Sequence, residues 1–391
     1  FMHICMVSPE YPPYPGGVGH SVRRIAKEIS SISGWCVSIM IPEFRSAVKT
    51  GVCREEIEKS SDENITVYRC KPPIHRISYN NRDQEVAFYE WLNYFIKEQH
   101  VDLVHSFYIS HTGFFSGVSA HANHLPFVAS IRGNDLHLNL FDSSRFPHIV
   151  WTLQNADLLT FVAASLQEIA KTIASFDTPS KVIWNSIDPL DFDENAKVAP
   201  DLQGLKGPVI GMAGDFRQKK GLDKLLTACH SLAFQATLLL IGDLNKDERE
   251  YWETKVLPEA PENIHILRIG TVPHHNMLAY YSLADIMVFP SSSDGCPNTL
   301  LEAMLAKRPV LCSDTGSMGD ILRASQAGLL IDPYQPAAFA SEISKLLADK
   351  ELRTEYGANG ESFVRKQLNI ENEKNNWLTC YEEVKHNYGR S

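Results

Sequence analysis

The sequence predicts an α/β protein made of two doubly wound, Rossmann-like domains that face each other across a cleft. Three observations lead to this prediction. Short apolar runs rich in β-forming residues alternate with helical patterns in both halves, as they do in parallel α/β sheets. A chain of 391 residues is too long for one ordinary hydrophobic core. A polar segment with Pro200 and Gly204 separates the two halves.

Each half has enough strands for a sheet of its own. In the first half we expect strands at His3–Val7, Val37–Ile41, Thr66–Cys70, Leu103–Ser106, Phe127–Ile131, Leu158–Val162 and Lys181–Trp184. In the second half we expect them at Val209–Met212, Thr237–Ile241, Ile264–Leu267, Ile286–Phe289, Val310–Cys312 and Gly328–Ile331. Open α/β sheets bind ligands beyond the carboxyl ends of their strands, so the loops at those ends are the candidate sites.

The expected division of the chain follows from these strands. Residues 1–190 form the first domain, residues 191–207 a linker and residues 208–370 the second domain. In the tail, residues 371–391, apolar side chains recur at helical spacing, which predicts a helix that packs back toward the first domain. These side chains are Trp377, Leu378, Tyr381 and Val384.

Composition narrows the class of protein. Hydrophobic residues at 44% and charged residues at 21% are typical of a soluble globular protein, and a net charge of −10 argues against general nucleic-acid binding. The eight cysteines are scattered, with no C-x-x-C pair, which indicates reduced thiols. No apolar run is long enough to cross a membrane. We therefore expect a cytoplasmic protein, with contact at the inner face of a membrane left open and no indication of oligomeric state.

Two loops carry patterns suited to phosphate. Gly16 and Gly17 follow the first strand and precede a helix, where glycines allow close backbone approach. A flexible surface loop is an equal alternative there. In the second half, Arg217, Lys219 and Lys220 lie between glycines after a strand, in an otherwise acidic protein. Their position favours neutralisation of a diphosphate over a merely solvated basic loop.

The segment from Ser291 to Ala306 combines a strand end, a turn and a helix start. Asp294 lies in the expected loop, and Glu302 projects from the first turn of the expected helix. Backbone N–H groups of residues 298–300 lie between the two acids, an arrangement that suits a sugar nucleotide. Two alternatives remain: Thr299 and Glu302 also form a capping-box pattern, and Asp294 can be an Asx-turn residue.

A further polar group of residues follows the strand Phe127–Ile131. Arg132, Asn134, Asp135 and His137 lie just past its end and are candidates for binding an acceptor or a phosphate. Nearby histidines raise the question of zinc, but His121 and His124 have no evident third ligand, so we expect no metal site.

In this order and spacing, these motifs resemble those of retaining glycosyltransferases of family 4, which have the two-domain GT-B fold. The resemblance covers nearly the whole chain. Besides the loops above, it rests on the runs Pro9–Pro13, Ile183–Asp188, Tyr280–Asp285, Pro290–Ser291, Pro309–Val310 and Asp314–Gly316.

The resemblance implies that a sugar nucleotide binds mainly the second domain and that the acceptor enters from the first. Asp294 would bond hydroxyls of the transferred sugar, and Glu302 those of the ribose. Arg217 and Lys220 would stabilise the leaving phosphate, so that these two and Asp294 are the implied catalytic residues. The implied donor-binding set is Gly16, Gly17, Arg132, Arg217, Lys220, Asp294, Gly295, Cys296, Pro297, Asn298, Thr299, Leu300 and Glu302. The acceptor set is Asn134, Asp135 and His137.

Three positions depart from the family pattern. The first acid is Asp294 where relatives usually have glutamate, and a side chain shorter by one methylene changes the fit of a donor sugar. Asp215 stands where the family has an arginine, so Arg217 would supply that charge. Arg132 replaces a histidine that often contacts the donor sugar. For Arg132, contact with phosphate and pairing with Asp135 are equally open.

The sequence thus predicts a metal-independent, retaining glycosyltransferase without a cofactor. It would move a hexose, with UDP-glucose as the first guess, to a glycan or lipid-linked oligosaccharide in polysaccharide biosynthesis. Two alternatives are a UDP-sugar 2-epimerase and a non-catalytic sugar-nucleotide binding protein. The donor sugar and the acceptor are not determined by these motifs.

Overall fold

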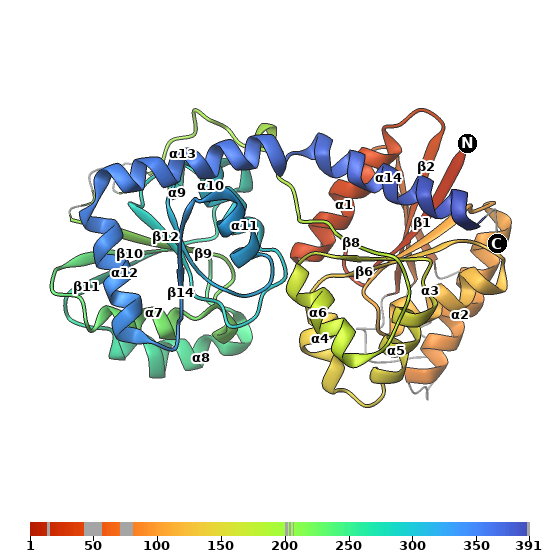
Figure 1. The fold of residues 1–391 in the computed structure, drawn as a ribbon, viewed down its shortest axis with the longest axis horizontal. Coiled ribbons are helices and arrows are strands. Elements are labelled where there is room, and N and C mark those ends of the chain that lie inside the picture. The colour runs from red at the N-terminus through yellow and green to blue at the C-terminus, as the bar shows by residue number, and fades with distance from the viewer. Residues whose placement is uncertain are drawn as a thin grey trace. The chain divides into compact units, whose positions relative to one another are not determined.

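The structure is a computed structural model of the 391-residue chain, and it describes residues 1–13, 16–42, 57–70, 81–199, 202, 205 and 207–388. Two compact units divide the chain. Unit 1 contains Phe1–Trp184 and Glu371–Ser391, and unit 2 contains Asn185–Ile370. Both are α/β units with helices packed against a central sheet (Figure 1). The change between units falls at residue 184, and the segment 191–207 that we expected as a linker is grouped with unit 2.

The sheet of unit 1 has the strand order β3-β4-β2-β1-β5-β6-β7-β8. Its strands are β1 (Met2–Val7), β2 (Trp35–Pro42), β3 (Ile57–Asp62), β4 (Ile65–Cys70), β5 (Leu103–Phe107), β6 (Phe127–Ile131), β7 (Leu158–Phe161) and β8 (Ser180–Val182). The sequence missed β3, an antiparallel edge strand whose side chains are mostly polar and exposed. An edge strand has a neighbouring strand on one side only, so its side chains can be exposed and need not be apolar.

The helices of unit 1 follow from apolar residues at helical spacing. In α1 (Gly17–Ser30), Val22, Ile25 and Ile29 are buried, as the spacing predicts. The others are α2 (Asn81–Glu98), α3 (His111–Ala122), α4 (Asn134–His137), α5 (Phe146–Asn155), α6 (Ala164–Ile173) and α14 (Ile370–Tyr388).

The C-terminal helix α14 is part of the core of unit 1. Trp377, Tyr381 and Val384 are buried against strand residues such as Ile4 and Val128. The hydroxyl of Tyr381 lies 2.8 Å from Nδ1 of His105 in β5. The helix also carries Glu373, whose carboxylate accepts from the guanidinium of Arg24 in α1 at 2.7 and 3.0 Å. The tail is therefore anchored by apolar, hydrogen-bonded and charged contacts together.

Unit 2 has a parallel sheet with the order β11-β10-β9-β12-β13-β14. Its strands are β9 (Val209–Ala213), β10 (Ala236–Ile241), β11 (Ile264–Gly270), β12 (Ile286–Phe289), β13 (Val310–Ser313) and β14 (Gly328–Ile331). All six lie where the sequence predicts them. The α-helices are α7 (Leu222–Cys229), α8 (Arg249–Tyr251), α9 (Met277–Tyr281), α10 (Asn298–Leu305), α11 (Met318–Ser325), α12 (Pro336–Ala348) and α13 (Lys350–Gln367).

Three expectations from the sequence concern membrane spans, cysteines and the polar segment between the halves. Within the described residues, no helix is long and apolar enough to cross a membrane. Seven of the cysteines are described and all seven are free thiols, six of them buried; Cys53 lies outside the described residues. Part of the segment around Pro200 and Gly204 is likewise not described.

Candidate functional site

The two loops of unit 2 that the sequence singled out flank the point where the strand order reverses. From β9 the chain moves outward through β10 and β11, and from β12 it moves to the other side through β13 and β14. The basic loop, residues 214–221, follows β9, and the loop with Asp294 follows β12. Because β9 and β12 are parallel neighbours, their carboxyl ends lie side by side. Doubly wound sheets bind ligands in the crevice at this switch point.

The closest contact across these loops is an ion pair. Nζ of Lys220 lies 2.6 Å from Oδ2 of Asp294, and the hydroxyl of Ser291 donates to the same oxygen at 3.3 Å. Both charged side chains are only partly accessible, at 20% and 13%. Asp294 is therefore not a simple Asx-turn residue. The two side chains lie together as a cation and a carboxylate that a sugar phosphate can contact.

Glu302 lies just past the first helical turn, in which the sequence places it. It is the fifth residue of α10, and its side chain is 6% exposed. The hydroxyl of Tyr281 lies 2.8 Å from Oε2, and Nε2 of His274 lies 3.3 Å from Oε1. The hydrogen bond to Glu302 raises the pKa of His274 above its ordinary value. The capping-box interpretation is therefore wrong, because this carboxylate bonds side chains of α9 and its preceding turn.

The amino terminus of α10 is held in place by a buried amide. Nδ2 of Asn185 donates to the carbonyl of Cys296 at 2.8 Å and to Oδ1 of Asn298 at 3.1 Å. Pro297 occupies the N-cap position and makes no side-chain cap. Of the three N–H groups that we expected for phosphate, that of Leu300 donates to the carbonyl of Pro297 at 3.2 Å. Those of Asn298 and Thr299 begin the helix, where N–H groups have no acceptor within the helix.

Two glycines allow the loops to approach one another. At Gly316, φ is +56°, and a Cβ would collide with the carbonyl oxygens of Asp294 and Gly295. At Gly221, φ is +78°, and a Cβ would collide with the carbonyl of Pro290. Residues with a side chain rarely adopt these conformations. The short distances between the loops therefore require glycine at both positions.

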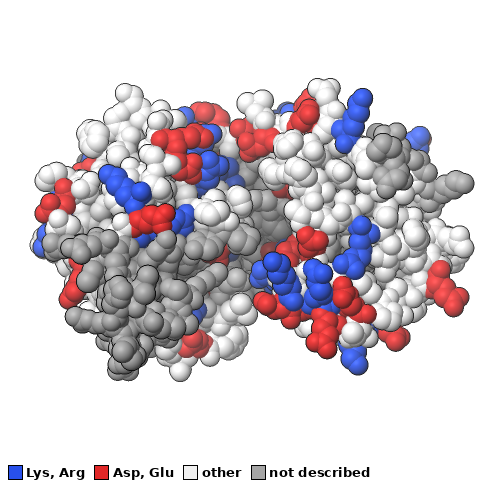
Figure 2. All heavy atoms as spheres, turned by 180° about the vertical axis from the view of Figure 1, so that it is seen from behind, with Lys and Arg blue, Asp and Glu red and all other residues white. Residues whose placement is uncertain are grey.

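Arg217 lies at the outer side of the basic loop. Its Nε lies 2.7 Å from Oδ2 of Asp215, and both side chains are about half exposed. Asp215 also accepts from Nδ2 of Asn245 at 3.0 Å. Asp215, which stands at the position of the family's arginine, thus forms an ion pair with Arg217. Figure 2 shows several clusters in which Lys or Arg side chains lie next to Asp or Glu side chains.

In unit 1, the first glycine loop starts α1. A Cβ on Gly16 would collide with the carboxylate of Glu10, whereas one on Gly17 would meet no atom within 4 Å. Tyr14 and Pro15, which precede these glycines, lie outside the described residues. The approach of a donor to Gly16 and Gly17 stays a prediction.

Past β6, the predicted polar residues form a buried turn. The carboxylate of Asp135 is fully buried and accepts from the N–H of Arg132 at 3.1 Å and of Gly133 at 2.8 Å. Burial raises the pKa of Asp135 to about 6. The guanidinium of Arg132 lies 6.0 Å from the ring centroid of Phe107. Asp135 thus shapes the backbone that presents Arg132 and starts α4; the acceptor roles of Asn134, Asp135 and His137 stay predictions.

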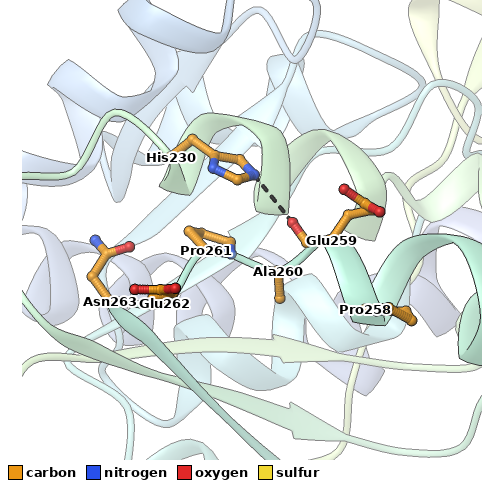
Figure 3. Close-up of a pocket in the computed structure, with 7 residues that line it drawn as sticks. All are labelled: His230, Pro258, Glu259, Ala260, Pro261, Glu262 and Asn263. Carbon is orange, nitrogen blue, oxygen red and sulfur yellow. Dashed lines mark hydrogen bonds between the residues drawn. The ribbon is translucent and has the colours of Figure 1, made fainter.

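Neither a metal centre nor a pocket elsewhere in unit 2 adds to this site among the described residues. Among the described residues, no group of three His, Cys, Asp or Glu side chains is arranged to hold a metal ion. A pocket of about 470 Å³ lies in unit 2, lined by His230 and residues 258–263 (Figure 3). These residues precede β10 and β11, so the pocket lies at the amino ends of the strands, away from the loops described above. Nε2 of His230 bonds the carbonyl of Glu259 there at 3.1 Å.

Sequence reasoning missed two residues that complete the surroundings of Glu302. No sequence motif assigns a role to His274, and Tyr281 belongs only to the run Tyr280–Asp285 of the family resemblance. Their contacts with Glu302 span 28 and 21 positions of the chain. The one available signal was their place: His274 follows β11, and Tyr281 ends α9 just before the predicted strand β12.

Known protein families match both units. The family described as Glycosyltransferase Family 4 matches residues 15–189, and Glycosyl transferases group 1 matches residues 194–363. A putative teichuronic acid biosynthesis glycosyltransferase, TuaC of Bacillus subtilis, is 25% identical over 64% of this chain and 62% of its own length. An uncharacterized glycosyltransferase of Methanocaldococcus jannaschii is 22% identical over the full length of both chains.

Solved structures agree on the fold. Sucrose-phosphate synthase from Thermosynechococcus elongatus superposes with a TM-score of 0.78 at 20% identity, over 98% of this chain and 99% of that one. Anabaena HepE, solved in complex with UDP, superposes with a TM-score of 0.74 at 16% identity, over 98% and 100%. These likenesses show the GT-B fold, with two parallel-sheet, Rossmann-like units. The chain belongs to the group 1 family of glycosyltransferases.

Proposed function

We propose that the chain is a retaining hexosyltransferase that uses a nucleoside diphosphate sugar, with UDP-glucose as the first donor to test. The acceptor is a glycan or a lipid-linked oligosaccharide in polysaccharide biosynthesis. The observation that carries the proposal is the pairing of Lys220 with Asp294 at the switch point of unit 2, beside the start of α10. A cation for phosphate, a carboxylate for sugar hydroxyls and free helix N–H groups are the groups that this donor class requires.

The chemistry follows from those charges. The bond between the anomeric carbon and the diphosphate oxygen breaks, and the acceptor oxygen bonds the same face of that carbon. The leaving phosphate oxygen takes the acceptor's proton. Negative charge grows on the diphosphate during this step, so Lys220, Arg217 and the N–H groups of Asn298 and Thr299 act where it develops. The proposal includes no metal ion and no other cofactor.

Relatives support the choice of substrates. HepE was solved with UDP, with UDP and glucose, and with UDP-glucose, which favours UDP-glucose as the first donor to test. TuaC is named for teichuronic acid biosynthesis, and a Staphylococcus aureus relative, CapM, for capsular polysaccharide biosynthesis. Those names favour a polysaccharide acceptor here. We also propose that the reaction takes place in the cytoplasm, with the acceptor presented at the inner face of the membrane.

The proposal is tested by a donor screen followed by product analysis. UDP-, GDP- and ADP-sugars are compared by thermal shift and by release of the nucleoside diphosphate, because a ligand stabilises the folded state according to its concentration relative to its Kd. We expect UDP-sugars to bind best and the product to keep the donor's anomeric configuration by NMR. An inverted anomer contradicts the retaining mechanism, and loss of turnover after EDTA treatment contradicts metal independence.

The same screen separates the alternatives. Epimerisation of a UDP-N-acetylhexosamine without acceptor would indicate a 2-epimerase, and UDP binding without turnover on any acceptor would indicate a binding protein. Family membership favours transfer over both.

A further inference from the structure

We propose that His274 and Tyr281 act as a pair of hydrogen-bond donors that orient Glu302 for the ribose hydroxyls of the donor nucleotide. This inference rests on the proposed function, in which Glu302 binds the ribose. It adds two positioning residues from the turn and helix that follow β11, neither of which touches the reacting atoms.

Tyr281 supplies the inner donor. Its side chain is fully buried at the end of α9, and its hydroxyl lies 2.8 Å from Oε2 of Glu302. Burial and the neighbouring carboxylate raise the pKa of Tyr281 well above its ordinary value, so the phenol keeps its proton. A protonated phenol beside a carboxylate can only donate to it. One oxygen of Glu302 is thereby fixed.

His274 supplies the outer donor. Its Nε2 lies 3.3 Å from Oε1 of Glu302, while its side chain is 60% exposed. The ring packs beside Phe192, with centroids 4.7 Å apart. The next residue is tied down as well, since the N–H of Asp193 donates to the carbonyl of His275 at 2.8 Å. The ring is thus held at the surface edge of a buried carboxylate.

The hydrogen-bonding capacity of Glu302 leaves room for a diol. A carboxylate has about four acceptor positions, two on each oxygen. Within the described part of the chain, Tyr281 and His274 are the two donors to this side chain, one on each oxygen. Two positions therefore remain, which matches the two donors of a ribose 2′,3′-diol. A carboxylate that is already oriented loses less freedom when the diol binds.

The test measures nucleotide affinity by calorimetry with UDP and 2′-deoxy-UDP. We expect His274→Ala and Tyr281→Phe each to weaken UDP binding about fivefold, the size of one lost hydrogen bond. The loss should be clearly smaller for 2′-deoxy-UDP, because that ligand lacks one of the hydroxyls that the oriented carboxylate binds. His274→Gln keeps an N–H donor and should restore most of the affinity. His275→Ala is the matched control, since that side chain is exposed and has no contact with Glu302.

The outcomes are separable. Equal losses for both ligands, or unchanged or tighter UDP binding in His274→Ala, would overturn the positioning role while leaving the proposed function intact. Should the wild type bind another nucleoside diphosphate in preference to UDP, that compound and its 2′-deoxy form serve as the pair. A wild type that binds none of them contradicts the proposed nucleotide site itself. Because Tyr281→Phe alters a buried group, the fold of this variant is checked by circular dichroism. If this variant does not fold, the positioning role is tested with the His274 variants alone, since that side chain is exposed.

Discussion

The loops at the carboxyl ends of the strands differ between the two units. In unit 2 the loops at the switch point bring together Lys220 and Asp294, both partly accessible. In unit 1 the switch point lies between β1 and β5, and beside it, past β6, the carboxylate of Asp135 is fully buried and bonded to backbone N–H groups. Lys220 and Asp294 of unit 2 thus stay partly accessible, whereas Asp135 of unit 1 stabilises its own loop. A polar residue at a strand end is therefore not by itself a binding residue.

One residue after strand β5 of unit 1 has a strained backbone. Tyr108 follows β5 with φ of +86°, an uncommon conformation for a residue with a side chain. Its N–H donates to the carbonyl of Ser130 at 2.9 Å, and its hydroxyl lies 3.4 Å from Oε1 of Glu10. Strained residues are found where the surroundings hold them firmly. These two contacts hold Tyr108 in this conformation.

The largest expected effect comes from breaking the accessible pair in unit 2. Lys220→Ala should lower the rate of glycosyl transfer about 10²- to 10³-fold, as the loss of one fixed donor to developing charge does elsewhere. Some loss of thermal stability is also expected, because Asp294, whose side chain is 13% exposed, is left without its cation. The measurement is steady-state kinetics beside a melting curve. Lys345→Ala, which removes an exposed lysine of α12, is the control. A rate within threefold of wild type would remove Lys220 from the site.

For unit 1 we expect a loss of stability with little change in nucleotide affinity. Asp135→Ala leaves the buried N–H groups of Arg132 and Gly133 without an acceptor, so unit 1 should lose about 2 kcal/mol of stability. UDP binding should stay within twofold of wild type.

Tryptophan fluorescence during urea unfolding can follow this loss. Five of the six tryptophans belong to unit 1: Trp35, Trp91, Trp151, Trp184 and Trp377. Asp135→Asn, which keeps one acceptor oxygen, should lie between the variant and wild type. If nucleotide affinity falls with the stability of unit 1, the contrast between the two units does not hold.

The third effect is a pH dependence of unit 1. Burial lowers the pKa of His105 from 6.5 to about 3, and its ring bonds Tyr381 and Ser130. Below pH 6.5 the unfolded chain takes up a proton that the folded unit refuses, so stability falls as the pH drops from 6.5 toward 3. At pH 5 the loss is about 2 kcal/mol.

Urea unfolding from pH 7.5 to 4.5 measures this slope. Other partly buried histidines, His111 and His148, have lowered pKa values and act in the same direction. The comparison is therefore with His105→Gln, which is less stable at pH 7 but should lose less stability on acidification. Parallel slopes for the two proteins would contradict a neutral, buried His105.

Much of the fold was predictable because apolar runs report burial directly. Every parallel strand was expected close to its observed place, and the buried face of α1 follows from its spacing. The exceptions have a physical cause. The edge strand β3 is polar, so nothing in its own residues requires a strand; it pairs with β4 along its whole length.

The site was predictable in part for a similar reason. The loops with Lys220 and Asp294 were found because each follows a strand that the sequence reveals. Their pairing could not be derived, since it depends on the neighbouring positions of β9 and β12 in the sheet. For Glu302, the local T-x-x-E pattern suggested a cap, while the structure pairs it with distant side chains.

The sequence by itself determined two α/β units, the loops at the carboxyl ends of their strands and the acidic and basic residues in those loops. These features depend on local periodicity and on residue order, which a linear chain displays. Only the tertiary structure decided which charged groups form contacts with one another and which are bonded to backbone groups. Lys220 meets Asp294, Glu302 meets His274 and Tyr281, and Asp135 meets backbone N–H groups. Such partnerships follow from sheet order and loop geometry, because hydrogen bonds and ion pairs act over a few ångströms whatever the separation along the chain.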